Sequence, residues 1–324
     1  MPEGRDEGEA AMKVEVRTVK NTAIHLNAPL SLCINREEDV PADSLAAVFA
    51  YTAPLPELME ITVTEGEETV FHGIVDEQSL VCSGGEIAVE ISARSMAALL
   101  LDNEARPQSY DRPGAADIFR RHILPLGLTE YCCGIKERPA RFEILKGMSQ
   151  WQALSLFCRS CLDSVPAVTP EGCVLMCGYK RGEEPLCFGG KGGRPYTEAC
   201  IKIKRCKRLS RVFVKTSAGQ GYDMIIEDSE ALRGGVKRER FLNASDPLSV
   251  PVSRADIMLE NGRKQSFEIT LTCPGRMTAA LGRAAQVEAR GEIFENLQVS
   301  GLQYKLLSGA ETTTLVLNRI KEDI

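Results

Sequence analysis

Two hairpin-like segments at opposite ends of the chain share residues at the same spacing. Residues 83–94 read SGGEIAVEISAR, and residues 308–319 read SGAETTTLVLNR. The shared residues are Ser83, Gly84, Glu86 and Arg94 in the first segment and Ser308, Gly309, Glu311 and Arg319 in the second. In both segments a Gly-containing turn leads into a strand-like run, and another strand-like run precedes it. Because internal similarity constrains architecture before any motif does, we expect the same β-unit twice. Two unrelated hairpins with similar turn chemistry are the alternative.

The composition is that of an ordinary globular protein. The 324 residues suffice for two or three domains, and 44% hydrophobic with 26% charged residues is typical of a folded chain. A net charge of −6 gives no global sign of nucleic-acid binding, and the longest apolar run, AALLL at 97–101, is too short for a membrane span. The acidic start, MPEGRDEGEA, is unlike a secretory signal. We expect residues 1–11 to be a disordered lead.

Hydrophobic periodicity divides the rest of the chain into three zones. Residues 12–106 alternate as strands do, whereas residues 107–197 mix helical and strand patterns. Residues 198–324 return to mainly strand patterns, after a Gly-rich stretch at 188–196 that suggests a hinge. We therefore predict an α+β, mainly β fold, in which two β domains (12–106 and 198–324) flank an α/β insert domain (107–197).

Cysteine is unusually frequent, with 12 residues. Because the chain shows no secretory signal, we expect reduced thiols, many of them buried as small hydrophobic side chains. A zinc-like spacing, C-x-x-C followed by C-x-x-x-C, is formed by Cys158, Cys161, Cys173 and Cys177. However, the first pair falls on the apolar stripe of a predicted helix that also carries Trp151, Leu154 and Leu162. We favour core packing, with zinc binding as the alternative.

Catalytic motifs are absent from the sequence. The three histidines are His25 and His72 in strand patterns and His122 in a helical pattern, and no H-E-x-x-H, G-x-S-x-G or P-loop occurs. The GGKGG run at 189–193 lacks the remainder of a phosphate loop and a following helix. We predict a protein that is not an enzyme and assign no catalytic, cofactor-binding or metal-binding residue. A zinc-dependent or cysteine-dependent enzyme, with residues brought together from distant segments, stays open as the alternative.

One segment of this acidic chain is strongly basic. Between residues 200 and 218 there is no acidic residue, and the basic ones are Lys202, Lys204, Arg205, Lys207, Arg208, Arg211 and Lys215. We favour a solvated sheet face or an edge strand protected by charge. Contact of this basic stripe (202–215) with an acidic partner or a nucleic acid is the alternative.

Several segments of the chain contain motifs that together carry a resemblance to a known protein family. Residues 71–128 contain an F-x-G-x-V-D strand, an ARS…LLDNEA.P segment and a helix ending in H..P.GL. A helix of the type G-x-S-x-W-x-x-L-x-x-F-C follows, on Gly147, Ser149, Trp151, Leu154, Phe157 and Cys158. These segments resemble the baseplate hub proteins of contractile-tailed phages, and KRCKRLSRVFVKTS and GVKRERFLN are similar to the second β-domain of these hubs. The resemblance covers nearly the whole chain after the first ten residues, and its motifs are structural.

The resemblance implies a structural role. It implies that each β domain is a tube-type β-barrel, and that a homotrimer presents six similar units to a sixfold tail tube. The expected partners are the tail tube protein above, the central spike protein below and other baseplate proteins, with no membrane span and no specific nucleic acid. The expected location is the virion tail baseplate, after assembly in the host bacterial cytoplasm. The resemblance does not distinguish an infectious phage from a defective prophage or a tail-like bacteriocin.

Overall fold

The computed structural model describes residues 12–51, 53–179, 184–215, 221–243 and 251–320, so the expected lead at 1–11 lies outside the described residues. The fold is mainly β, as predicted, and thirteen strands form one sheet. The first zone contributes β1 (Met12–Thr18), β2 (Ala23–Leu26), β3 (Ser31–Glu37), β4 (Ser44–Ala50), β5 (Leu58–Glu65), β6 (Glu68–Ser83) and β7 (Glu86–Ser95). The other strands are β13 (Leu186–Phe188), β14 (Glu198–Ile203), β18 (Phe267–Pro274), β19 (Ala284–Ala289), β20 (Glu292–Leu307) and β21 (Ala310–Arg319).

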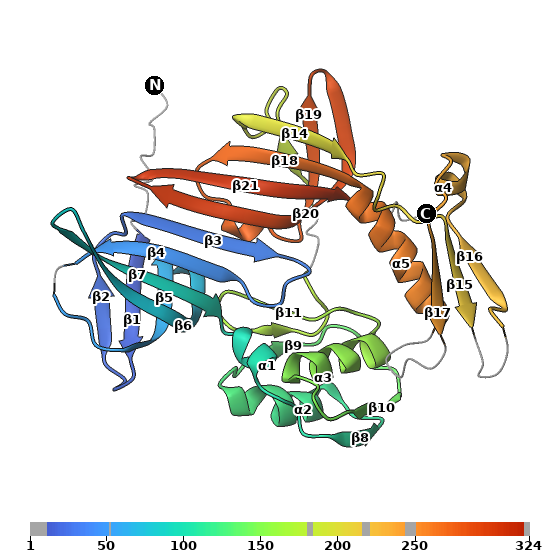
Figure 1. Cartoon of the computed structure of the whole chain (residues 1–324), viewed down its shortest axis with the longest axis horizontal. Coiled ribbons are helices and arrows are strands. Elements are labelled where there is room, and N and C mark those ends of the chain that lie inside the picture. The colour runs from blue at the N-terminus through green and yellow to red at the C-terminus, as the bar shows by residue number, and fades with distance from the viewer. Residues whose placement is uncertain (1–11, 52, 180–183, 216–220, 244–250, 321–324) are drawn as a thin grey trace, which may run out of the picture.

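The strands from both ends of the chain join directly. The order is β14-β18-β21-β20-β3-β4-β7-β6-β5-β1-β2, and β19 pairs with both β20 and β13. The two halves meet where β20 pairs antiparallel with β3 (Figure 1). Among the described strands this order is open at both ends, so the tube-type barrels remain a prediction.

A duplicated unit accounts for most of this sheet. Strands β4 to β7 (residues 44–95) and strands β18 to β21 (residues 268–319) have the same length and pairing order. Their registers agree at one constant offset, which we call the repeat offset and which places Ser44 on Glu268. The exception is the β-bulge between the second and third strands, which follows Val63 in the first unit and Ala285 in the second. Ser44↔Arg94 matches Glu268↔Asn318, Phe49↔Val89 matches Cys273↔Thr313, and Glu65↔Glu68 matches Ala289↔Glu292. Each unit has a 16-residue strand followed by a 10-residue strand. The sequence prediction of a repeated β-unit is confirmed for these four strands.

The alignment derived from the sequence is wrong by one residue. It matched Ser83 with Ser308, whereas the pairing matches Ser83 with Leu307 and Gly84 with Ser308. The β-bulge in the pairing of each long strand with the strand that follows it supports the repeat offset. This bulge falls at Asp76 in the β6–β7 pairing and at Ser300 in the β20–β21 pairing. The identical Ser-Gly dipeptides at 83–84 and 308–309 are therefore shifted by one residue relative to the structural alignment. A one-residue shift exchanges the two faces of a strand. The pattern of buried residues therefore fixes the alignment where sequence identity is misleading.

The middle region (residues 96–179) has its own core. Its elements are α1 (Ala98–Asp102), β8 (Gln108–Asp111), α2 (Ala115–Ile118), β9 (Tyr131–Cys132), β10 (Arg141–Ile144), α3 (Gln150–Phe157), β11 (Ala167–Val168) and β12 (Val174–Leu175). Ser149 caps α3 by accepting from the Gln152 N–H, and a hairpin forms around Gly172. Leu154 and Phe157 are fully buried in this core, whereas Trp151 packs against it half-buried.

A small satellite (residues 204–266) is inserted between β14 and β18. It contains β15 (Arg211–Lys215), β16 (Met224–Glu227), α4 (Ser229–Arg233), β17 (Glu239–Asn243) and α5 (Pro251–Ser266). Helix α5 packs on one face of the three-stranded sheet, where Val212, Val214 and Leu259 are buried. The first unit has only the short link from β3 to β4 at this point, so the satellite distinguishes the two halves (Figure 1). In the described part of the chain, no helix has the length and apolarity that a membrane crossing requires.

Candidate functional site

A buried arginine joins the three zones. Arg36 lies at the end of β3, is 4% exposed and forms an ion pair with Asp43, with Nε 2.9 Å from Oδ2. Its Nη1 donates to the Thr278 carbonyl oxygen of the third zone at 2.8 Å, and its Nη2 donates to the Tyr179 hydroxyl of the middle region at 3.2 Å. The Tyr179 hydroxyl in turn donates to the carbonyl oxygen of Val168 at 3.0 Å. One guanidinium therefore fixes three parts of the fold relative to one another.

The environment makes this junction sensitive to the loss of either charge. Burial raises the pKa of the Asp43 carboxyl, and the adjacent Arg36 guanidinium opposes that effect. The Asp43 backbone is held by Ser95, whose Oγ accepts from the Asp43 N–H at 3.0 Å. A buried charge without its partner is costly, so both members are needed together.

Sequence reasoning missed this junction, although a signal was present. Strand β3 reads SLCINRE, and its buried face carries Leu32, Ile34 and Arg36 at alternating positions. An arginine on the buried face of a strand needs a carboxylate partner inside the protein. The sequence does not show which carboxylate that is, because Asp43 and the Tyr179 hydroxyl are placed by the tertiary fold.

In the described residues, Lys264 and Arg276 also form ion pairs between the first and third zones. Lys264 in α5 lies 2.6 Å from Glu38, measured from Nζ to Oε2. Arg276 contacts Glu65 and lies 3.8 Å from Glu68, at the tip of the β5–β6 hairpin. These contacts indicate that the charged side chains at the zone boundary have structural roles.

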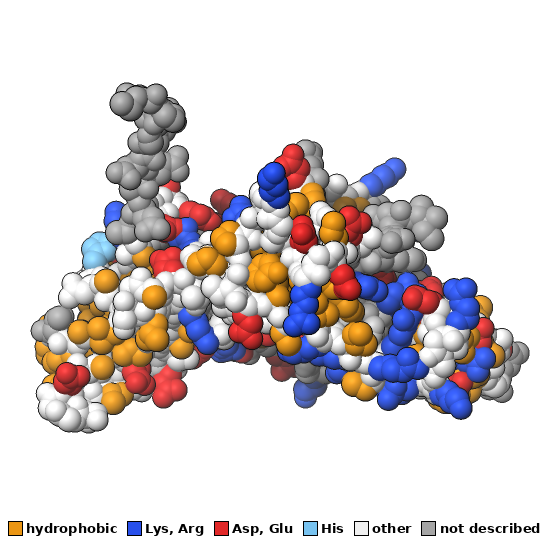
Figure 2. Space-filling view, turned by 90° about the horizontal axis from the view of Figure 1, so that it is seen from above, with side chains coloured by type: hydrophobic (Ala, Val, Ile, Leu, Met, Phe, Trp, Pro, Cys, Tyr) orange, Lys and Arg blue, Asp and Glu red, His pale blue; other side chains and the backbone are white. Residues whose placement is uncertain are grey.

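Four of the seven basic side chains in the basic stripe pair with carboxylates in the described structure. Lys202 and Lys204 both pair with Glu268 on the neighbouring strand. In the satellite, Arg208 pairs with Asp228 and Glu230, while Arg211 pairs with Glu227 and Glu239. Figure 2 shows Lys and Arg side chains gathered toward the right-hand end, with Asp and Glu side chains among them. This arrangement favours the solvated sheet face over a polyanion-binding surface.

The cysteines are free thiols, and the described residues contain no group of three or more Cys, His, Asp or Glu side chains arranged to hold a metal ion. Cys158 and Cys161 lie in the π-helical turn Cys158–Leu162 that continues α3, and both are fully buried. Burial raises the pKa of the Cys158 and Cys161 thiols, which keeps them protonated. The interpretation of this pair as core packing is confirmed by its burial.

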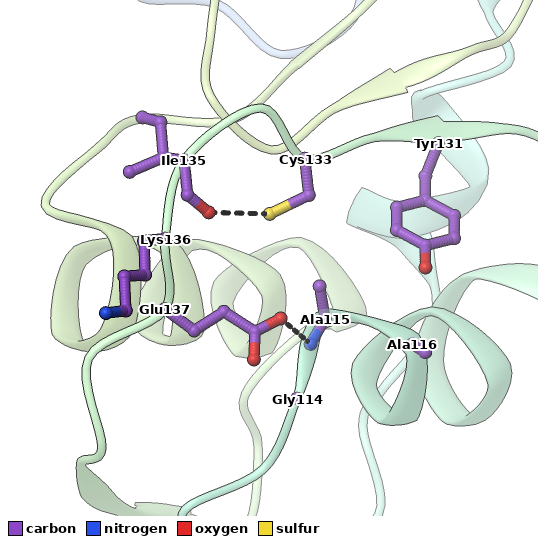
Figure 3. Close-up of a pocket in the computed structure, with 8 residues that line it drawn as sticks. All are labelled: Gly114, Ala115, Ala116, Tyr131, Cys133, Ile135, Lys136 and Glu137. Carbon is purple, nitrogen blue, oxygen red and sulfur yellow. Dashed lines mark hydrogen bonds between the residues drawn. The ribbon is translucent and has the colours of Figure 1, made fainter.

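An open pocket of about 800 Å³ lies in the middle region (Figure 3). Its carboxylate, Glu137, accepts from the Ala115 N–H at 2.7 Å and so caps the start of α2. Cys133 Sγ donates to the Ile135 carbonyl oxygen at 3.7 Å, and burial raises the pKa of its thiol. The polar groups of the pocket thus serve the fold, and the arrangement does not resemble a nucleophile with a base.

The remaining candidates from the sequence also have structural roles. His122 is buried, with Nε2 2.8 Å from the Tyr110 hydroxyl and Nδ1 2.7 Å from Gln150 Oε1, and burial lowers its pKa. The run at 189–193 forms a tight turn after Phe188, where a Cβ on Gly193 would collide with the Gly189 carbonyl oxygen. Leu186 and Phe188 pack in the core of the third zone. Although the predicted insert (107–197) includes this turn, it follows β13, which pairs with β19 in the sheet of the third zone, and in the described residues no helix begins directly after it.

Comparison with known proteins identifies the fold. No protein-family model matches the chain, and no curated protein matches it by sequence. Among solved structures, a tail protein from Neisseria meningitidis is 20% identical with a TM-score of 0.77, covering 95% of this chain and 96% of that one. A 43 kDa tail protein of prophage MuSo2 from Shewanella oneidensis is 15% identical with a TM-score of 0.77, covering 95% and 98%.

A third similar structure comes from a secretion system. An E. coli protein described as a type VI secretion component with structural similarity to T4 tail proteins gp27 and gp5 is 10% identical, with a TM-score of 0.55, covering 96% of this chain and 77% of that one. At these identities the matches establish the fold. The chain has the fold of these phage tail proteins, which agrees with the resemblance predicted from the sequence at the level of the fold.

Proposed function

We propose that this chain is a structural hub subunit of a phage tail baseplate or a related injection particle. In this proposal it forms a homotrimeric ring that joins the tail tube to the central spike. The observation that carries the proposal is the duplicated unit with its constant repeat offset, within a fold that matches phage tail proteins along almost their whole length. Two equivalent units in each chain let a trimer present six similar surfaces.

The placement of polar groups supports a structural role. Three charged or titratable side chains illustrate this: buried Arg36 joins the zones, exposed Glu137 caps the start of α2, and buried His122 lies in hydrogen-bond contact with Tyr110. The proposed division has β domains at 12–106 and 198–324, each a tube-type barrel in the assembled ring, around an insert at 107–197. The proposed location is the tail baseplate of the virion, and the proposed absence of enzymatic activity follows from the same role.

The test is reconstitution with the expected partners. The full chain is co-expressed with the tube and spike proteins encoded beside it, purified through a tag on the spike, and its stoichiometry is measured by native mass spectrometry. We expect three copies of this chain for each trimeric spike, and rings by electron microscopy. Recovery of spike and tube without this chain, or with one copy of it, would overturn the proposal.

A further inference from the structure

The two halves of the chain are joined by antiparallel pairing between the edges of β20 and β3. The outer half of β20, residues 301–307, pairs with β21 on one side and with β3 on the other. In the β3 pairing, Ile34 lies opposite Tyr304 and Cys33 lies opposite Lys305. Both Ile34 and Tyr304 are fully buried. The joint is therefore a close antiparallel pairing between the first unit and the second.

The duplication supplies a second copy of both edges. The repeat offset relates residues 301–307 of β20 to residues 77–83 of β6. Strand β14 corresponds to β3, because Ile201 pairs with Ile269 as Ile34 pairs with Leu45. Within the described residues, residues 77–83 pair only with β7, and β14 pairs only with β18. The part of the chain that the structure describes therefore has one free edge of each kind.

The side chains on these free edges are those that a partner would bury. Leu80 is 58% exposed, although its counterpart Tyr304 is fully buried. Ile201 is 41% exposed, although its counterpart Ile34 is fully buried, and the neighbouring Ile203 is 79% exposed. Open strand edges with apolar side chains are sites at which another strand pairs. Residues 77–83 of β6 and strand β14 therefore correspond in position to residues 301–307 of β20 and strand β3, which already pair with each other.

We infer that β14 of one copy pairs antiparallel with residues 77–83 of β6 in the next copy, in the register of the β3–β20 joint. Ile201 then lies opposite Leu80, Cys200 opposite Val81, and Ala199 opposite Cys82. The contact is head to tail, so it repeats from copy to copy and closes into a ring when the rotation permits. This inference rests on the proposed function, because it names the surfaces that would hold the ring together.

Cysteine crosslinking tests the register. Val81→Cys places a thiol opposite the native Cys200, and Ala199→Cys places one opposite the native Cys82. Opposed residues in antiparallel strands have Cα atoms about 4.5–5.5 Å apart, within the range that a disulfide requires. Adjacent pairs alternate between the two hydrogen-bonding classes, so one of these two variants has the closer geometry.

The chain provides matched controls. Lys305→Cys tests the same geometry inside one chain, because Lys305 lies opposite the native Cys33. Leu80→Cys shifts the new thiol by one residue, to the opposite face of the strand, and is the negative control. Each variant is expressed as the full chain with its tube and spike partners and is mildly oxidised. The crosslinked peptides are identified by mass spectrometry.

The outcomes separate this inference from the proposed function. We expect Val81→Cys or Ala199→Cys to convert most of the chain to disulfide-linked oligomers at the named pair, with at least tenfold less crosslinking for Leu80→Cys. If the chain enters the ring and the Lys305→Cys control crosslinks while neither edge variant does, the inference is wrong and the hub function stands. If Leu80→Cys crosslinks better than Val81→Cys, the register is wrong. If the chain does not enter a complex at all, the hub function itself fails.

Discussion

The two units, residues 44–95 and residues 268–319, have the same backbone register but almost unrelated sequences. When the two units are aligned at the repeat offset without a gap, four positions are identical. Val63, Glu68, Val75 and Gly85 of the first unit match Val287, Glu292, Val299 and Gly309 of the second. Their last strands nevertheless bury the same positions, with Val89, Ile91 and Ala93 corresponding to Thr313, Leu315 and Leu317. The alternation of buried positions and the turn locations preserve the fold, and individual side chains vary around them.

The units differ most at their boundaries. The first unit ends β3 with the buried pair Arg36–Asp43, whereas the corresponding residues of the second unit are Ile203 and Phe267. The second unit also carries the satellite between β14 and β18. On the far side, β5 pairs antiparallel with β1, whereas β19 pairs parallel with β13. A duplicated unit has thus acquired different neighbours, and the buried polar group lies where the two halves are joined.

The largest expected effect comes from the joined edge. Arg36→Ala removes the guanidinium and leaves Asp43 buried without its ion-pair partner, so we expect the free energy of unfolding to fall by about 3–5 kcal/mol. The matched control is Ile203→Ala at the corresponding free-edge position, where we expect a change within about 0.5 kcal/mol in the isolated chain. Urea denaturation followed by circular dichroism measures both. Equal losses for the two variants would contradict the contrast between joined and free edges.

The next comparison uses two isoleucines at equivalent positions. Ile34→Ala removes a fully buried side chain, and we expect a loss of about 2–5 kcal/mol from transfer and cavity terms. Ile201 is 41% exposed, so Ile201→Ala should cost less than about 1 kcal/mol in the isolated chain. The same denaturation experiment applies. In the assembled particle the difference should shrink, because the inferred pairing buries Ile201.

The local features of the two units could be predicted from the sequence, whereas the register of the repeat and the contacts between zones could not. Strand alternation and the repeated hairpins were predicted because they are local patterns. The register of the repeat was not, because a Ser-Gly match one residue away outweighed the burial pattern. The Arg36 junction was missed because Thr278 and Tyr179 are distant in the sequence. Contacts between zones depend on tertiary packing, which periodicity does not encode.

The satellite gives a smaller and pH-dependent effect. Burial acts to raise the pKa of Asp228, but the hydrogen bond from the Ala231 N–H and the ion pairs with Arg263 and Arg208 hold that pKa below its usual value. A lowered folded-state pKa contributes stability above the unfolded-state pKa of about 3.9, and this stability is lost as the pH falls through the folded-state value. Asp228→Ala should also cost about 0.5–2 kcal/mol at neutral pH, through the lost cap of α4.

Hydrogen exchange of the α4 amides, corrected for the intrinsic pH dependence, measures this effect. Asp228→Asn is the control, because it keeps a capping oxygen without the charge, and it should remove the acid dependence while retaining most of the neutral-pH protection. Protection in the first unit should not change in either variant. Parallel loss in both units would show that the satellite is not a separate unit of stability.

The smallest effect concerns the first turn position of the two hairpins, where one has glycine and the other has serine. The residues between β6 and β7 are Gly84 and Gly85, with φ of 61° and 86°, and those between β20 and β21 are Ser308 and Gly309, with φ of 50° and 81°. Both turns need positive φ at both positions, which serine adopts at a cost of about 1 kcal/mol. A Cβ at Gly84 would meet no atom within 4 Å, so the cost there is conformational and not steric. We expect Gly84→Ser to destabilise by about 1 kcal/mol and Ser308→Gly to stabilise by about 0.5–1 kcal/mol. Thermal unfolding of both variants measures the difference. Changes of the same sign at the two positions would show that the turns are not equivalent and would contradict the repeat offset, which places Gly84 on Ser308.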